Sequence, residues 1–190
     1  MSIDAIVLLK EDHKRVRQLF KRFESLGPSA SKAKKDVVDK IIEELSVHSG
    51  IEEQIFYPAA REVLEDDSMV LEDLEVHHIM KWTLSELARM RPEDERFDPK
   101  MKVLMDTVRN HVEEEEADLF PALREAFGRT RLHEIGEAMK KAKRFVPKRP
   151  HPLMPDTPPA NVIVGTAAGV ADTVIDLTKG AVRKVTRRGQ

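Results

Sequence analysis

The sequence contains no cysteine, and aromatic residues make up only 5% of its 190 positions. The absence of cysteine excludes disulfide bonds, thiolate metal sites and cysteine nucleophiles. Charged residues account for 35% of the chain, and so many charges with so few aromatics are typical of solvated amphipathic helices rather than of sheets. We therefore expect an all-α protein with one sizeable domain.

Long apolar runs and a strong net charge are also missing. No uninterrupted apolar stretch of ~20 residues could cross a bilayer, and the first residues lack the basic start and apolar core of a signal peptide. We therefore expect a cytoplasmic protein. The formal net charge of −2 gives no overall field that would attract nucleic acid, so we expect no nucleic-acid partner.

Apolar residues recur at three- to four-residue intervals in several segments that proline and glycine separate. This spacing is typical of amphipathic helices, and Asp4, Ser31 and Ser68 are suitable residues for helix starts. The expected helices span about residues 4–24, 31–58, 68–87 and 98–128, and a short fifth helix follows over about residues 130–143.

The C-terminal part of the chain differs in composition from the rest. Six of the fourteen residues from 147 to 160 are proline, which excludes a continued helix and predicts a linker. Residues 161–190 carry an apolar stripe at helical spacing and a basic end, so we expect an amphipathic helix there. The predicted divisions are a helical bundle over residues 1–146, a linker over 147–160 and the tail helix over 161–190.

The tail helix has several candidate contacts. Its stripe could dock on its own bundle, on a second copy in a homo-oligomer or on a protein partner. Its basic end also fits weak contact with a membrane surface, because a stripe of mostly alanine and valine inserts weakly.

An internal repeat is the most informative feature of the sequence. Residues 48–62 match residues 111–125 at a shift of 63, and seven of the fifteen positions are identical. His13 and His77 match at a shift of 64, each two residues after a glutamate. Each half is therefore expected to be a helical hairpin, and two such hairpins predict an up-down-up-down four-helix bundle.

The repeated residues have the spacing of metal ligands. Each copy holds a histidine and a glutamate four positions apart, which places both on one face of a helix. The other two histidines follow the apolar stripes of their helices and should point inward. Two buried carboxylates would cost several kcal/mol per ion without a compensating positive charge. The sequence thus predicts a two-metal site made by His13, His48, Glu52, His77, His111 and Glu115.

The donor set consists of imidazoles and carboxylates, which suit iron, manganese or zinc. Each metal would receive two histidines, and Glu52 and Glu115 could bridge the pair. Positions would remain for water, oxo or small gaseous ligands.

The doubled His-x-x-x-Glu-Glu motif, closed in each copy by an aromatic residue and proline, resembles the hemerythrin family. The similar branch is the one with His-His-Glu (HHE) cation-binding domains, and the resemblance covers roughly residues 3–127. It implies a non-haem di-iron centre, bridged by oxo or hydroxo, on the six residues named above; manganese or zinc is the less expected metal. It further implies binding of, or reaction with, O2, H2O2 or NO, including catalase-like peroxide disproportionation.

One position departs from the oxygen-carrying members of that family. They have a second histidine four residues after the third-helix histidine, where this chain has Lys81. This departure weakens an oxygen-carrier role. Since metals would repel a facing cation, we expect Lys81 to extend outward.

Several neighbouring residues remain alternatives. Glu116, Glu44 and His78 are candidate additional ligands, whereas the acidic run with Glu53 is expected to form a solvated face. Tyr57 and Trp82 are candidates for positions near the centre, although core packing is the commoner role of such residues.

Two further functional interpretations remain open. One is a non-catalytic protein that senses or stores iron or oxygen. The other is an interaction bundle that holds zinc or no metal.

Overall fold

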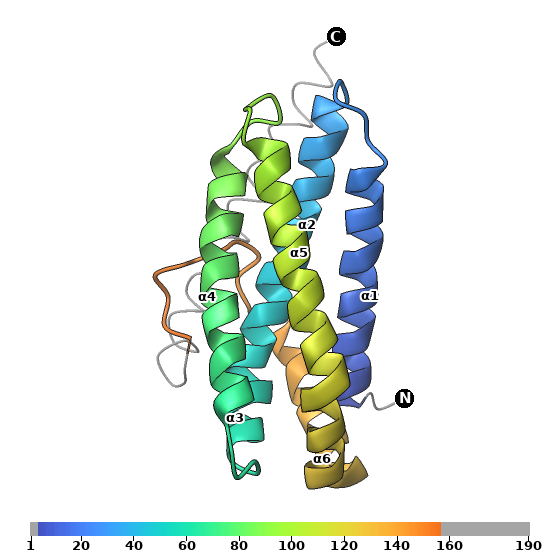
Figure 1. Ribbon diagram of the computed structural model, residues 1–190. Helices are drawn as coiled ribbons and strands as arrows, with labels where there is room; N and C mark the ends of the chain where they lie inside the picture. The colour runs from blue at the N-terminus through green and yellow to red at the C-terminus, as the bar shows by residue number, and fades with distance from the viewer. Residues whose placement is uncertain (1–3, 157–190) are drawn as a thin grey trace.

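The computed structural model describes residues 4–156 of the chain, and its long elements are all helical. Four helices run side by side with alternating direction (Figure 1). They are α1 (Ala5–Glu24), α2 (Ser31–Ile51), α4 (Ser68–Arg89) and α5 (Phe97–Glu114). The prediction of an all-α, up-down-up-down four-helix bundle is confirmed.

The helix starts follow local hydrogen bonding. The Asp4 carboxylate accepts hydrogen bonds from the backbone N–H groups of Ile6 and Val7 and so caps α1. At the start of α4, the Asp66 carboxylate accepts from the backbone N–H of Ser68. These side chains satisfy donors that a helix end leaves without partners.

The second and fourth long helices continue beyond their metal-binding motifs through π-helical turns. Turn η1 (Glu52–Phe56) leads into α3 (Tyr57–Arg61), and η2 (Glu115–Leu119) leads into α6 (Phe120–Ala142). In both turns, the backbone N–H of the residue after the turn bonds the carbonyl five residues back, that of Glu52 or Glu115. A proline follows each turn, and the wider turn relieves its clash with the preceding turn. The two copies of the sequence repeat therefore also share the same π-helical backbone turn.

The short fifth helix is the second arm of α6. Gly128 separates the two arms with a φ of +67°, a conformation that glycine adopts without strain. Ile135 and Met139 of the second arm pack in one cluster with the first turns of α1. Just beyond α6, Val146 contacts α2 at Gly50, where an added Cβ would lie 2.3 Å from Val146 Cγ1.

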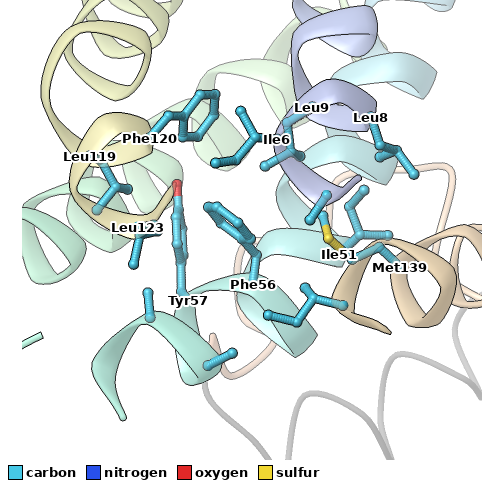
Figure 2. Close-up of a cluster of buried hydrophobic side chains, with 14 of the residues drawn as sticks. Ile6, Leu8, Leu9, Ile51, Phe56, Tyr57, Leu119, Phe120, Leu123 and Met139 are labelled. Carbon is cyan, nitrogen blue, oxygen red and sulfur yellow. The ribbon is translucent and has the colours of Figure 1, made fainter. Parts of the chain in front are cut away.

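The apolar core consists of two clusters, and the histidines lie between them. One cluster includes Ile6 and Leu9 of α1 together with Phe56, Tyr57 and Phe120 (Figure 2). The other is built from α1 beyond His13, α2 before His48, α4 beyond His77 and most of α5, including Val16, Leu45, Met80 and Val108. His13, for example, lies between Leu9 of the first cluster and Val16 of the second.

The inward face of α4 leaves out two large apolar residues. Trp82, a candidate for a position near the centre, is 45% exposed, and Ile79 is 59% exposed. The buried face instead includes His77, Met80 and Leu84, which are three or four residues apart. Ile79 follows His77 by two residues, about 200° around the helix, and therefore faces outward.

The tail helix predicted over residues 161–190 lies outside the described residues, as does the end of the predicted linker. The division into bundle, linker and tail remains a prediction. Within residues 4–156, no helix is both long and apolar enough to cross a membrane.

Candidate metal centre

The six predicted ligands lie together in the middle of the bundle, and each is at most 3% exposed. Their donor atoms form two groups, within each of which the atoms are at most 4.8 Å apart. The first group is His13, His48, Glu52 and Glu115, and the second is Glu52, His77 and His111. Glu52 belongs to both groups, as a bridging ligand would.

The two glutamates lie between the two groups. Glu52 Oε2 is 3.2 Å from His48 Nε2 and 3.5 Å from His77 Nε2. In the second copy of the repeat, Glu115 Oε2 is 3.3 Å from His13 Nε2 and 3.6 Å from His111 Nε2. Each carboxylate oxygen thus faces one histidine from each group, which is the arrangement of a pseudo-symmetric two-metal site.

Several donor atoms at this centre have no hydrogen-bond partner among the residues that the structure describes. They are His13 Nε2, both ring nitrogens of His48, both carboxylate oxygens of Glu52, and Glu115 Oε2. A buried polar atom left in this state costs about 1–3 kcal/mol, so a cluster of them is rare in folded proteins. Cations would satisfy these atoms together, and the side chains present therefore fit a pair of metal ions.

The electrostatics separate the two carboxylates. Burial raises the pKa of Glu52 well above its ordinary value, and the nearby Glu115 raises it further. Burial also acts to raise the pKa of Glu115, but His111 and His13 outweigh it and hold that pKa below its usual range. In the metal-free protein Glu52 therefore retains a proton at pH values where Glu115 is ionised.

Burial also favours the neutral form of two of the histidines. It lowers the pKa of His48 to about 4 and lowers that of His77. For His111, burial is outweighed by Glu115 and Asp73, and the pKa is raised. A neutral imidazole offers the lone pair that a metal needs.

The outer nitrogens of the histidines face carboxylates. His13 Nδ1 lies 2.8 Å from Glu116 Oε1, and the corresponding His77 Nδ1 lies 3.0 Å from Glu53 Oε1. His111 Nδ1 lies 2.9 Å from Asp73 Oδ1. Such partners fix the tautomer and ring orientation of a metal-binding histidine, so that Nε2 points to the metal.

The fourth histidine has a looser outer partner. His48 Nδ1 is 3.6 Å from Asp12 Oδ2, too far for a hydrogen bond. Lys143, just beyond α6, holds both oxygens of Asp12 at 2.6 Å, and Arg15 also bonds this carboxylate. Burial acts to raise the pKa of Asp12, but His48 and Lys143 outweigh it and lower that pKa to about 2. The arm after Gly128 thus anchors the surroundings of the centre.

Asp12 and Asp73 were missed from the sequence. Asp73 precedes His77 by four residues, which places it on the same face of α4. Asp12 follows the buried Leu8 and Leu9 at helical spacing. These positions on buried faces are the signal that could have identified both carboxylates.

The three alternative ligands occupy other roles. Glu116 bonds the outer nitrogen of His13 rather than the interior. Glu44 bonds Arg15 at 3.2 Å on the surface. His78 accepts a hydrogen bond from the exposed Trp82 at 3.3 Å. Neither His78 nor Trp82 therefore lies at the centre.

Two further expectations were wrong. Glu53 was expected on a solvated face but is 2% exposed, and Lys81 was expected to extend outward but is 8% exposed. Lys81 Nζ donates a hydrogen bond of 2.6 Å to Glu53 Oε2. The buried Glu53 carboxylate attracts the ammonium inward and shields it from the metal positions, since this carboxylate lies between Lys81 and His77.

Tyr57 lies between the centre and a pocket. Its hydroxyl donates to Glu115 Oε1 at 3.0 Å and is 3.4 Å from His77 Nε2. Burial raises its pKa well above the ordinary value, and the Glu115 charge adds to this shift, so the phenol keeps its proton. A pocket of about 370 Å³ has Tyr57 and Glu53 in its wall, together with Pro58, Arg61, Glu62, Asp67, Leu74 and Asp156.

The fold and the site define a helical bundle with an interior cation-binding centre. The family model of the hemerythrin HHE cation binding domain matches residues 4–123. The chain belongs to this family.

Two curated relatives and one solved structure are similar to the chain. An uncharacterized hemerythrin-like protein of Schizosaccharomyces pombe is 28% identical over 141 residues, which cover 73% of this chain and 70% of that protein. A DNA nickase of Nostoc sp. is 27% identical over 144 residues, 75% of this chain but 40% of the nickase, so the chain spans less than half of that protein.

The solved structure is that of a hemerythrin HHE cation binding domain-containing protein from Mycobacterium kansasii. It matches with a TM-score of 0.64 and 23% identity, covering 74% of this chain and 85% of that one. At this identity the match shows the fold.

Proposed function

We propose that the chain is a non-haem di-iron protein that binds or reacts with dioxygen, hydrogen peroxide or nitric oxide, and that catalase-like peroxide disproportionation is its enzymatic activity. The observation that carries the proposal is the pair of two-histidine groups that Glu52 and Glu115 join. Bound iron would supply the redox chemistry.

The protein shell leaves room for a small ligand. Two imidazoles and two shared carboxylates give each metal position four protein ligands at most, fewer than the six positions of an octahedral ion. Lys81 does not add a ligand because its ammonium bonds Glu53. The remaining positions are open to exchangeable small molecules.

The pocket beside Tyr57 brings open space close to the centre, although none of the six predicted ligands lines it. Its wall includes Glu53 and Tyr57, which both contact residues of the centre. Tyr57 holds a proton on its hydroxyl, 3.0 Å from Glu115 Oε1, and can donate a hydrogen bond towards the centre. The bulk of the bundle excludes water elsewhere, since the six ligands are at most 3% exposed.

The test is to load metal-free protein anaerobically with Fe²⁺ and then add hydrogen peroxide on an oxygen electrode. Sustained release of one O2 per two H2O2 supports the catalase-like activity, and the His111→Ala variant should lose it. Reversible absorption changes with O2 or NO but no turnover would support the sensor or storage interpretation. Protein that binds zinc but no iron would contradict the proposal and leave an interaction bundle.

A further inference from the structure

A cation follows the first histidine of each repeat by four residues. Arg17 follows His13, and Lys81 follows His77, so the two cations match at the same shift of 64 as the histidines. Positions four apart share one face of a helix. Lys81 stands where the oxygen carriers have a histidine ligand, and Arg17 is the matching cation in the other half of the chain.

Each of these cations bonds the carboxylate that faces its histidine. Lys81 Nζ lies 2.6 Å from Glu53 Oε2, while Glu53 Oε1 lies 3.0 Å from His77 Nδ1. In the other half, Arg17 lies 3.1 Å from the Glu116 oxygen that is 2.8 Å from His13 Nδ1. Glu53 and Glu116 themselves match at the repeat shift of 63.

We propose that these are two copies of one clamp, in which the cation holds a carboxylate against Nδ1 of the histidine so that Nε2 faces the metals. The clamp supports the metal centre of the proposed function. Lys81 and Arg17 are positioning residues in this arrangement, since they act through Glu53 and Glu116. Lys81 is thus the cation of a repeated element rather than a lost ligand.

The two copies differ in their exposure to solvent. The side chains of Lys81 and Glu53 are 10% and 2% exposed, whereas those of Arg17 and Glu116 are 48% and 24% exposed. Water screens the outer pair, and exposed ion pairs contribute little. Breaking a buried pair is far more disruptive because it leaves a buried charge uncompensated. Lys81 should therefore matter more for its metal position than Arg17 does for the other.

The experiment titrates Co²⁺ into metal-free protein and follows binding by visible absorption. The Lys81→Met variant should lose about 10- to 100-fold in affinity at one of two sites, the usual effect of removing such a supporting residue. The matched variant Arg17→Met should change affinity by less than about fivefold. Lys81→Arg should restore most of the loss, because arginine also bonds a carboxylate.

A double variant separates positioning from charge compensation. Lys81→Met leaves the Glu53 carboxylate buried without its cation and is expected to lower stability, whereas Glu53→Leu with Lys81→Met removes both charges. The clamp predicts that the double variant unfolds near the wild-type temperature yet still binds Co²⁺ weakly at one site. Long-range ¹H–¹⁵N spectra of the metal-free protein should show the His77 proton on Nδ1 in the wild type and not in the double variant.

Wild-type Co²⁺ affinity at both sites in the double variant would overturn the clamp and reduce Lys81 to charge compensation. A wild-type protein that binds no Co²⁺ would instead count against the metal centre itself. In that case the His77 tautomer still tests the clamp, because the spectra are taken without metal.

Discussion

Replacing Glu52 with methionine should stabilise the metal-free protein, although it removes a central ligand. Glu52 is fully buried, and neither carboxylate oxygen has a hydrogen-bond partner among the described residues. An unsatisfied buried polar group costs about 1–3 kcal/mol, and methionine fills a similar volume without that cost. A chain of this length changes its Tm by about 2–4 °C per kcal/mol, so the metal-free Tm should rise by about 2–12 °C.

Metal should offset this gain. With free metal at 100 times its Kd, ligand linkage stabilises the wild type by about 2.7 kcal/mol, an increase that the Glu52→Met variant should lose. Thermal unfolding with EDTA and with anaerobic Fe²⁺ measures both effects. The control is Glu44→Met, which removes an exposed carboxylate of α2, the helix that leads into Glu52, and should change stability by at most about 0.5 kcal/mol. A lower metal-free Tm together with a preserved metal response would refute the assignment of Glu52.

Three other outcomes follow from the same geometry. The raised pKa of Glu52 contributes stability to the metal-free fold that is present below the ordinary pKa and is lost as pH rises through the raised value. Metal binding between these two pH values should therefore release protons, measured in weak buffer. Gly50→Ala should lower the free energy of unfolding, measured in urea, by about 1–3 kcal/mol, because the new Cβ would lie 2.3 Å from the Val146 side chain. The control Gly27→Ala should be nearly neutral, because its Cβ would meet no described atom within 4 Å. His77→Ala should reduce the bound metal measured by elemental analysis, whereas His78→Ala should leave it unchanged, and equal losses in both would contradict the orientation of α4.

The fold and the convergence of six side chains could be predicted because both depend on periodicity. The histidine-to-glutamate interval of four fixes two residues on one helix face, and the repeat at shifts of 63 and 64 implies that two hairpins meet. Neither inference requires the exact course of any loop. Metal binding by these six residues remains a prediction that their geometry fits.

The partners of the histidines depend on details that periodicity does not carry. Glu53 belongs to an acidic run that is typical of a solvated face, but it follows the buried Ser49 by four residues, and its bonds to His77 and Lys81 depend on how α4 packs against it. Lys81 then turns inward because Glu53 is there. Lys143 and Asp12 are 131 positions apart in the sequence. Their contact requires the kink at Gly128.

Anomalous diffraction at the iron edge, from crystals of the iron-loaded protein, would locate the metals themselves. Two peaks per chain are expected: one within bonding distance of His13 Nε2 and His48 Nε2, and the other within bonding distance of His77 Nε2 and His111 Nε2, with Glu52 and Glu115 between them. A single peak, or peaks bound to other side chains, would contradict this arrangement.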